Sequence, residues 1–117
     1  MDTTINYEKV TEDIRKFTMA AVSESRYEHS VRTAQMCKKL CEHYGLDPRR
    51  GYLCGIAHDM CKKIDDGLLI SLASKDGKPI SDLEKDKPAL LHGRAAAVKI
   101  QKDFGITDEQ IIQAVAN

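Results

Sequence analysis

The stretch from Ser25 to Gly45 most strongly constrains the fold, because it carries the signals of a helix at both ends. Ser25 and Glu28 fit a capping box, in which two side chains bond to free amide groups of a first helical turn. Small or apolar residues then recur with the helical period, and Gly45 supplies a typical stop. The pattern predicts an amphipathic helix with one buried face.

Similar signals recur along the rest of the chain. Asp47 and Pro48 offer an N-cap and a first-turn proline for the next helix. Apolar stripes of helical period predict further helices over residues 7–22 and 89–104. Residues 107–110 fit a second capping box, which predicts a last short helix.

Residues 65–87 are less regular and predict two short helical segments joined by a turn. No segment shows the alternation of polar and apolar residues that is typical of a strand. A chain of 117 residues has the size of one domain. We therefore expect an all-α bundle of about six helices, in a single domain over residues 1–117.

Charge and hydropathy exclude several classes of partner. The 18 basic and 18 acidic residues balance, which argues against the basic face that binds nucleic acids. The apolar run 68–73 is too short to span a bilayer, and residues 1–6 are too polar for a secretory signal. We expect a cytoplasmic protein without a nucleic-acid or membrane partner. Its four cysteines are interpreted as packing residues, with a metal or redox role as the alternative.

His58 and Asp59 lie in an apolar stretch, residues 53–61, which is predicted to be a buried helix. An unpaired carboxylate there is costly, so we expect a compensating cation, and a metal ion is the strongest candidate. His29 and His92 lie at the edges of other apolar helix faces and are candidates for further nitrogen ligands. The alternative is that each histidine is simply a residue at the boundary of the core.

Other residues near this doublet extend the hypothesis. Gly55 and Gly93 interrupt helical patterns, which indicates either a close helix contact or the approach of a ligand. Imidazoles with a carboxylate suit Fe, Mn, Co, Ni or Zn, and such ions activate water and neutralise phosphate oxygens. The basic residues nearest in sequence would form an anion-binding rim, the alternative being solvated helix charges: Arg26, Lys62 and Arg94.

Three motifs in this order resemble the HD-domain metallophosphohydrolase superfamily: Arg26–Ser30, His58–Lys62 and Leu90–Gly93. They are most similar to its YqeK-like branch, the symmetrical dinucleoside tetraphosphatases. That resemblance implies a helical HD domain with a di-iron centre. It also implies cleavage of diadenosine tetraphosphate into two ADP molecules.

The resemblance also implies a role for each matching residue. His29, His58 and Asp59 would bind the first metal, Asp59 would bridge to the second, and His92 would bind the second. A bridging hydroxide would attack phosphorus, with Asp59 and Lys62 as the catalytic residues. The phosphates would be held by Lys62, Arg26 and Arg94.

The family pattern continues with a histidine-threonine motif and a late aspartate, beyond Asn117. The chain therefore resembles the N-terminal part of the domain, and its helix over residues 111–116 is expected to expose an apolar face. A homodimer through that face is one expectation. The alternatives are a non-catalytic HD-type module that binds a nucleotide or a protein partner, and hydrolysis of another phosphate ester, such as a nucleoside monophosphate.

Overall fold

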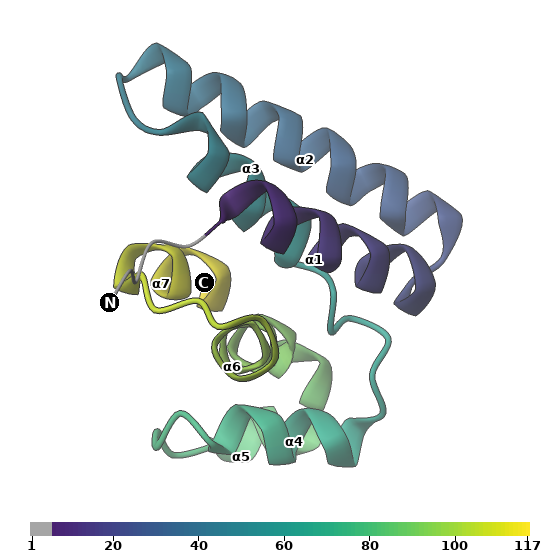
Figure 1. The fold of residues 1–117 in the computed structure, drawn as a ribbon. Helices are drawn as coiled ribbons and strands as arrows, with labels where there is room; N and C mark the ends of the chain where they lie inside the picture. The colour runs from purple at the N-terminus through teal and green to yellow at the C-terminus, as the bar shows by residue number, and fades with distance from the viewer. Residues whose placement is uncertain (1–5) are drawn as a thin grey trace.

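The computed structural model describes residues 6–117, which fold into helices joined by short loops (Figure 1). The helices are α1 (Tyr7–Ala21), α2 (Glu24–His43), α3 (Pro48–Ala57), α4 (Asp66–Ser74), α5 (Asp82–Asp86), the 3-10 helix η1 (Pro88–Leu91), α6 (His92–Phe104) and α7 (Glu109–Ala116). The predicted all-α fold is confirmed, with seven α-helices in the described residues where about six were expected. Most of the polar N-terminal segment that argues against a secretory signal, residues 1–5, lies outside the described residues. Within residues 6–117, no helix combines the length and the apolar character needed to cross a membrane.

Helix α6 lies in the middle of the fold, with α1, α2 and α3 on one side and α4 and α5 on the other (Figure 1). Its buried face carries mainly small side chains, including Ala95 and Ala96, which allow neighbouring helices to approach closely. The core around it is formed by apolar side chains from four other helices: Ile14, Leu53, Ile56, Leu69, Ile111 and Val115.

Two glycines mark close contacts between helices. A Cβ at Gly55 in α3 would lie 2.4 Å from the Cα of Ala34 in α2. A Cβ at Gly93 in α6 would lie 2.7 Å from the carbonyl oxygen of Ala116 in α7. Backbone atoms cannot move aside as a flexible side chain can, so a close helix contact explains both glycines.

The last helix does not expose the apolar face that the sequence led us to expect. Ile111 and Val115 of α7 are each 1% exposed, because they pack into the core. Arg50 of α3 also forms an ion pair of 2.7 Å with Asp108, at the start of α7. The predicted homodimer through this helix is therefore not supported by an exposed apolar face.

Two helices begin at residues other than those predicted. Helix α2 is capped by Ser23, not Ser25, because Ser23 has an extended backbone and its Oγ accepts a hydrogen bond from the amide of Arg26 at 3.4 Å. Helix α7 is capped by Asp108, not by the preceding threonine, since this carboxylate accepts hydrogen bonds from two amides of the first turn. The predicted start of α3, with its aspartate cap and first-turn proline, is confirmed.

Two helix boundaries fall at the predicted ligands, where the sequence predicted continuous helices. Helix α3 ends at Ala57, and the following residues form tight turns in which the Lys62 amide donates to the Asp59 carbonyl at 3.0 Å. The predicted helix over residues 89–104 is divided into η1 and α6, so that His92 is the first residue of α6. Both ends therefore leave ligand side chains at the margin of the core.

Candidate metal centre

The carboxylate of Asp59 is the point on which the candidate ligands converge. Its side chain is 7% exposed, and the Nε2 atom of His92 lies 3.4 Å from its Oδ1. On the other oxygen, Oδ2, the Nε2 atoms of His58 and His29 lie at 3.5 and 3.9 Å. The structure thus brings together all the side chains that the sequence predicts as metal ligands.

Three separate elements position these side chains. His29 lies in the second turn of α2. His58 is the C-cap of α3 and keeps a helical backbone, while Asp59 opens the turn that follows. His92 approaches from the start of α6. The centre therefore forms only when α2, α3 and α6 are packed together.

Two of the imidazoles have their tautomer fixed by the backbone. The Nδ1 atom of His58 lies 2.5 Å from the carbonyl oxygen of Gly55, and that of His92 lies 2.8 Å from the carbonyl oxygen of Ala89. A carbonyl oxygen only accepts, so Nδ1 carries the proton in both rings. In the neutral rings, each Nε2 then directs a lone pair toward Asp59. Metal-binding histidines commonly have this second hydrogen bond.

The result is a group of acceptors that face one another. Among the described residues, no group donates a hydrogen bond to the Asp59 side chain. The charged group of Arg26 is near, but its Nη1 atom is 3.9 Å from Oδ2, beyond hydrogen-bond distance. The ligand atoms of His29, His58 and Asp59 all lie within 4.8 Å of one another. Nitrogen and carboxylate donors at this spacing fit a divalent transition metal such as iron or manganese.

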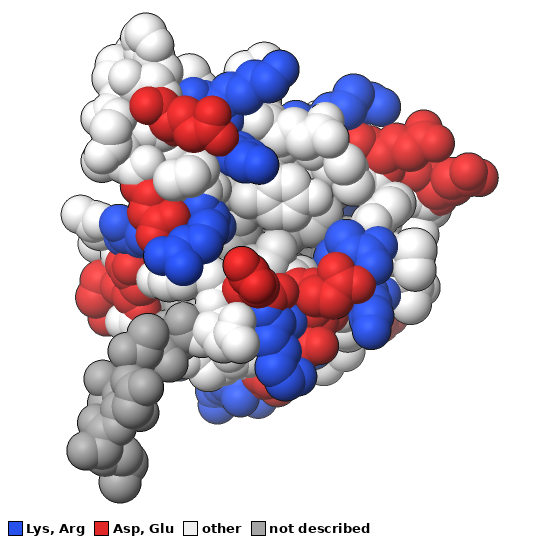
Figure 2. Space-filling model, turned by 45° about the horizontal axis from the view of Figure 1, so that its top comes forward, with Lys and Arg blue, Asp and Glu red and all other residues white. Residues whose placement is uncertain are grey.

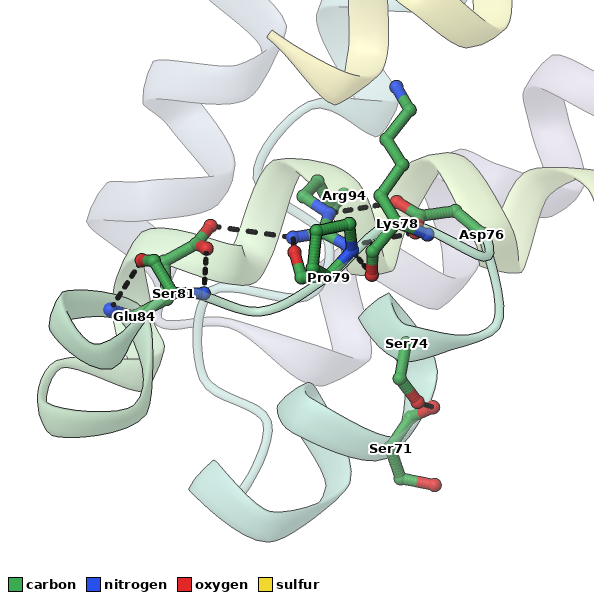
Figure 3. Close-up of polar contacts among 8 residues, drawn as sticks. All are labelled: Ser71, Ser74, Asp76, Lys78, Pro79, Ser81, Glu84 and Arg94. Atoms are coloured by element: carbon green, nitrogen blue, oxygen red, sulfur yellow. Dashed lines mark hydrogen bonds and ion pairs between the residues drawn. The ribbon is translucent and has the colours of Figure 1, made fainter.

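The two remaining basic residues of the predicted anion-binding rim, Lys62 and Arg94, differ in their surroundings. Lys62 is half-buried in the turn after Asp59, and no acidic group among residues 6–117 pairs with it. Arg94 donates to both carboxylate oxygens of Asp76 at 2.8 Å, and to the carbonyls of Lys78 and Pro79 at 3.1 and 3.3 Å (Figure 3).

Arg94 therefore anchors the loop between α4 and α5 to α6. Its guanidinium also lies 3.5 Å from a carboxylate oxygen of Glu84, which Ser81 holds in a capping box (Figure 3). These contacts, rather than the Asp59 cluster, occupy its donors. To bind a phosphate, Arg94 would have to release this loop, so Arg26 and Lys62 are the better placed cations.

Sequence reasoning overlooked one residue beside the ligands. Ser30 follows His29, is fully buried, and its hydroxyl has no hydrogen-bond partner among the described residues. Its position in the sequence could have indicated this burial, because Ser30 lies one helical turn before Ala34 on the buried face of α2.

Two hollows in the described part of the molecule lie away from Asp59. One of about 340 Å³ lies between α1 and α3, beside Tyr7 and Tyr52, and one of about 350 Å³ borders α6 and α7. None of the candidate ligands lines either hollow. On the face shown in Figure 2, acidic and basic side chains are interspersed.

Comparison with known proteins identifies the family. A family model described as the HD domain matches residues 26–117, a span that contains all the candidate ligands. The chain belongs to the HD domain family. A crystal structure of an HD superfamily hydrolase from Clostridium acetobutylicum, described as involved in NAD metabolism, superposes on this HD domain with a TM-score of 0.81. The two are 28% identical, and the match covers 90% of this chain and 56% of that one.

This HD domain is also similar to curated enzymes. It is 31% identical over 104 residues to the symmetrical bis(5'-nucleosyl)-tetraphosphatase of Staphylococcus aureus. The aligned region covers 89% of this chain and 53% of the relative. The enzyme of the same name from Bacillus subtilis is 27% identical over 94 residues, covering 80% of this chain and 50% of the relative. The chain thus spans about half the length of the curated relatives it matches.

Proposed function

We propose that this HD domain is the metal-binding part of a phosphohydrolase that cleaves dinucleoside tetraphosphates symmetrically, diadenosine tetraphosphate into two ADP. The observation that carries the proposal is the convergence of three imidazoles on the buried carboxylate of Asp59, with no donor among the described residues to satisfy it. The names of the Staphylococcus aureus and Bacillus subtilis relatives support the choice of substrate.

The arrangement of the site favours binding of a divalent cation. The Nε2 atoms of His29 and His58 and the carboxylate of Asp59 would be its ligands, and His92 would hold a second such ion beside Asp59. Iron is our proposal for the metal, with manganese, cobalt and nickel as ions that suit the same donors. When bound, such an ion would polarise a phosphoryl oxygen and activate water for attack on phosphorus.

The side chains of this chain would supply the rest of the chemistry. The backbone carbonyls of Gly55 and Ala89 hold the Nδ1 protons of His58 and His92, which keeps the Nε2 atoms available as ligands. Arg26, whose side chain is 41% exposed, can approach a phosphate through two N–H groups while remaining beside Asp59.

Lys62 would act as the second phosphate-binding cation and as a catalytic residue. Its ammonium would stabilise the charge that develops on the phosphoryl oxygens in the transition state. Because Lys62 and Asp59 are joined by a backbone hydrogen bond of 3.0 Å, the turn fixes the base of the lysine relative to the ligand.

The test is a product analysis with the purified 117-residue chain. Diadenosine tetraphosphate is incubated anaerobically with iron(II) or manganese(II), and ADP is separated from ATP and AMP by chromatography. We expect metal-dependent formation of ADP alone, lost in Lys62→Ala and retained in Lys63→Ala, a matched lysine in the same turn. Formation of ATP and AMP would contradict symmetrical cleavage. Absence of turnover with bound metal would favour the alternative of a non-catalytic module that binds nucleotide.

A further inference from the structure

Two hydroxyl-bearing residues are fully buried in the described part of the chain, Thr18 on α1 and Ser30 on α2. The Thr18 hydroxyl donates to the carbonyl of Ile14 at 2.9 Å and lies 3.4 Å from the carbonyl of Ile56. The Ser30 hydroxyl has no partner among the described residues. A buried hydroxyl without a hydrogen bond is unfavourable, so an alanine would serve packing better at this position.

The packing of α2 on α3 places Ser30 at the level of the metal centre. Gly55 contacts the backbone of Ala34, which fixes the register of the two helices. Asp59 follows Gly55 by four residues, just past the end of α3, and Ser30 precedes Ala34 by one turn of α2. The same turn of α2 approaches Asp59, since the Nε2 atom of the neighbouring His29 is 3.9 Å from Asp59 Oδ2.

Asp59 is the group at this level that lacks a donor. A carboxylate accepts several hydrogen bonds, and carboxylates that bind metals are usually held by such bonds from neighbouring groups. Arg26 and His29 are both too distant for one at 3.9 Å, and the Nε2 atoms of His58 and His92 present lone pairs. Ser30 is therefore a buried donor without an acceptor, at the same level of the packing of α2 on α3 as an acceptor without a donor.

We propose that Ser30 is a positioning residue of the metal centre, whose hydroxyl donates a hydrogen bond to the Asp59 carboxylate when a cation is bound. The role rests on the proposed function, because it requires that this HD domain binds a metal. In the metal-free chain the hydroxyl stays without a partner, at a cost in stability. Metal binding orders the carboxylate and removes that cost.

This role predicts that stability and metal affinity change in opposite senses. Ser30→Ala removes an unsatisfied hydroxyl, so the Tm of the metal-free chain should stay the same or rise. Its affinity for manganese(II) should fall, by about 10-fold to 100-fold, as for other partners that orient metal ligands. Thr18→Val is the matched control: it removes a satisfied hydroxyl, and should lower the Tm without weakening metal binding.

The experiment titrates manganese(II) into the wild-type chain and both variants by calorimetry, and measures the Tm of each without metal. Weaker binding by Ser30→Ala with an unchanged or higher Tm is the expected result. Wild-type affinity in Ser30→Ala, or a Tm as low as that of Thr18→Val, would overturn the positioning role. If the wild-type chain itself bound no manganese, both this role and the proposed function would be contradicted.

Discussion

His92 Nε2 lies 3.4 Å from Asp59 Oδ1, although α4, α5 and η1 separate the two residues in the chain. The contact depends on two helix ends, because Asp59 follows the end of α3 and His92 begins α6. The cluster is therefore a tertiary feature whose ligands cannot meet until α6 has packed in the centre of the fold.

The first prediction concerns the metal ligands themselves. His58→Ala removes an Nε2 lone pair that faces Asp59, so we expect the metal content of the purified chain, measured by elemental analysis, to fall to background. His43→Ala is the control, because His43 lies in the last turn of α2, outside the cluster. Equal metal content in both variants would show that the metal binds elsewhere.

Arg94 should contribute to stability and not to metal binding. Arg94→Ala removes the contacts that anchor the loop between α4 and α5, and we expect a loss of about 1–3 kcal/mol in the free energy of unfolding. Urea denaturation measures this loss, and metal titration should give the wild-type affinity. A variant of normal stability with weakened nucleotide binding would instead assign Arg94 to the substrate.

The same ion pair should make stability depend on pH in the acid range. Hydrogen bonds from Arg94 hold the pKa of Asp76 below its ordinary value. The unfolded chain therefore binds this proton more readily than the folded one. The ion pair contributes its full stabilisation of the folded chain above the ordinary aspartate pKa of about 3.9, and this stabilisation is lost as the pH falls below that value. Asp76→Asn should flatten this part of the profile of Tm against pH, and a parallel profile would contradict the assignment.

The sequence predicts the candidate ligands better than it predicts the helix ends that hold them. The structure brings the four predicted ligands together, and each of them lies at the edge of an apolar helical stripe within a motif. The end of α3 was not identifiable. Met60 and Cys61 continue the apolar pattern, yet they reach the core from a turn, where both are fully buried.

Tertiary contacts decide other features that the sequence does not predict. The placement of Arg94 depends on Asp76 and Glu84, which come from the irregular segment 65–87 and give no local signal. Ser23 and Ser25 both suit an N-cap, and sequence spacing alone does not choose between them.

The contact of Gly55 with α2 should be essential for the centre. Gly55→Ala places a Cβ 2.4 Å from the Cα of Ala34, which forces α3 away from α2 and separates Asp59 from His29. We expect the free energy of unfolding to fall by about 1–3 kcal/mol. The chains that remain folded should bind metal more weakly. Gly67→Ala, at an exposed position of α4, should change stability by less than about 1 kcal/mol. Equal effects of the two substitutions would contradict the close packing of α2 on α3.

The cysteines should behave as packing residues in the native chain. Burial raises the pKa of the Cys54 and Cys61 thiols to about 11, so few thiolates form near neutral pH. At pH 8, iodoacetamide should label Cys61 slowly in the folded chain and rapidly in urea, as followed by mass spectrometry. Rapid labelling of native Cys61 would contradict its burial.

The most direct test of the metal centre is anomalous diffraction from crystals grown with manganese(II). We expect a peak between the Nε2 atoms of His29 and His58 and the carboxylate of Asp59, and a second peak beside His92. A map without a peak at Asp59, or with manganese bound only elsewhere on the chain, would contradict a metal centre at this position.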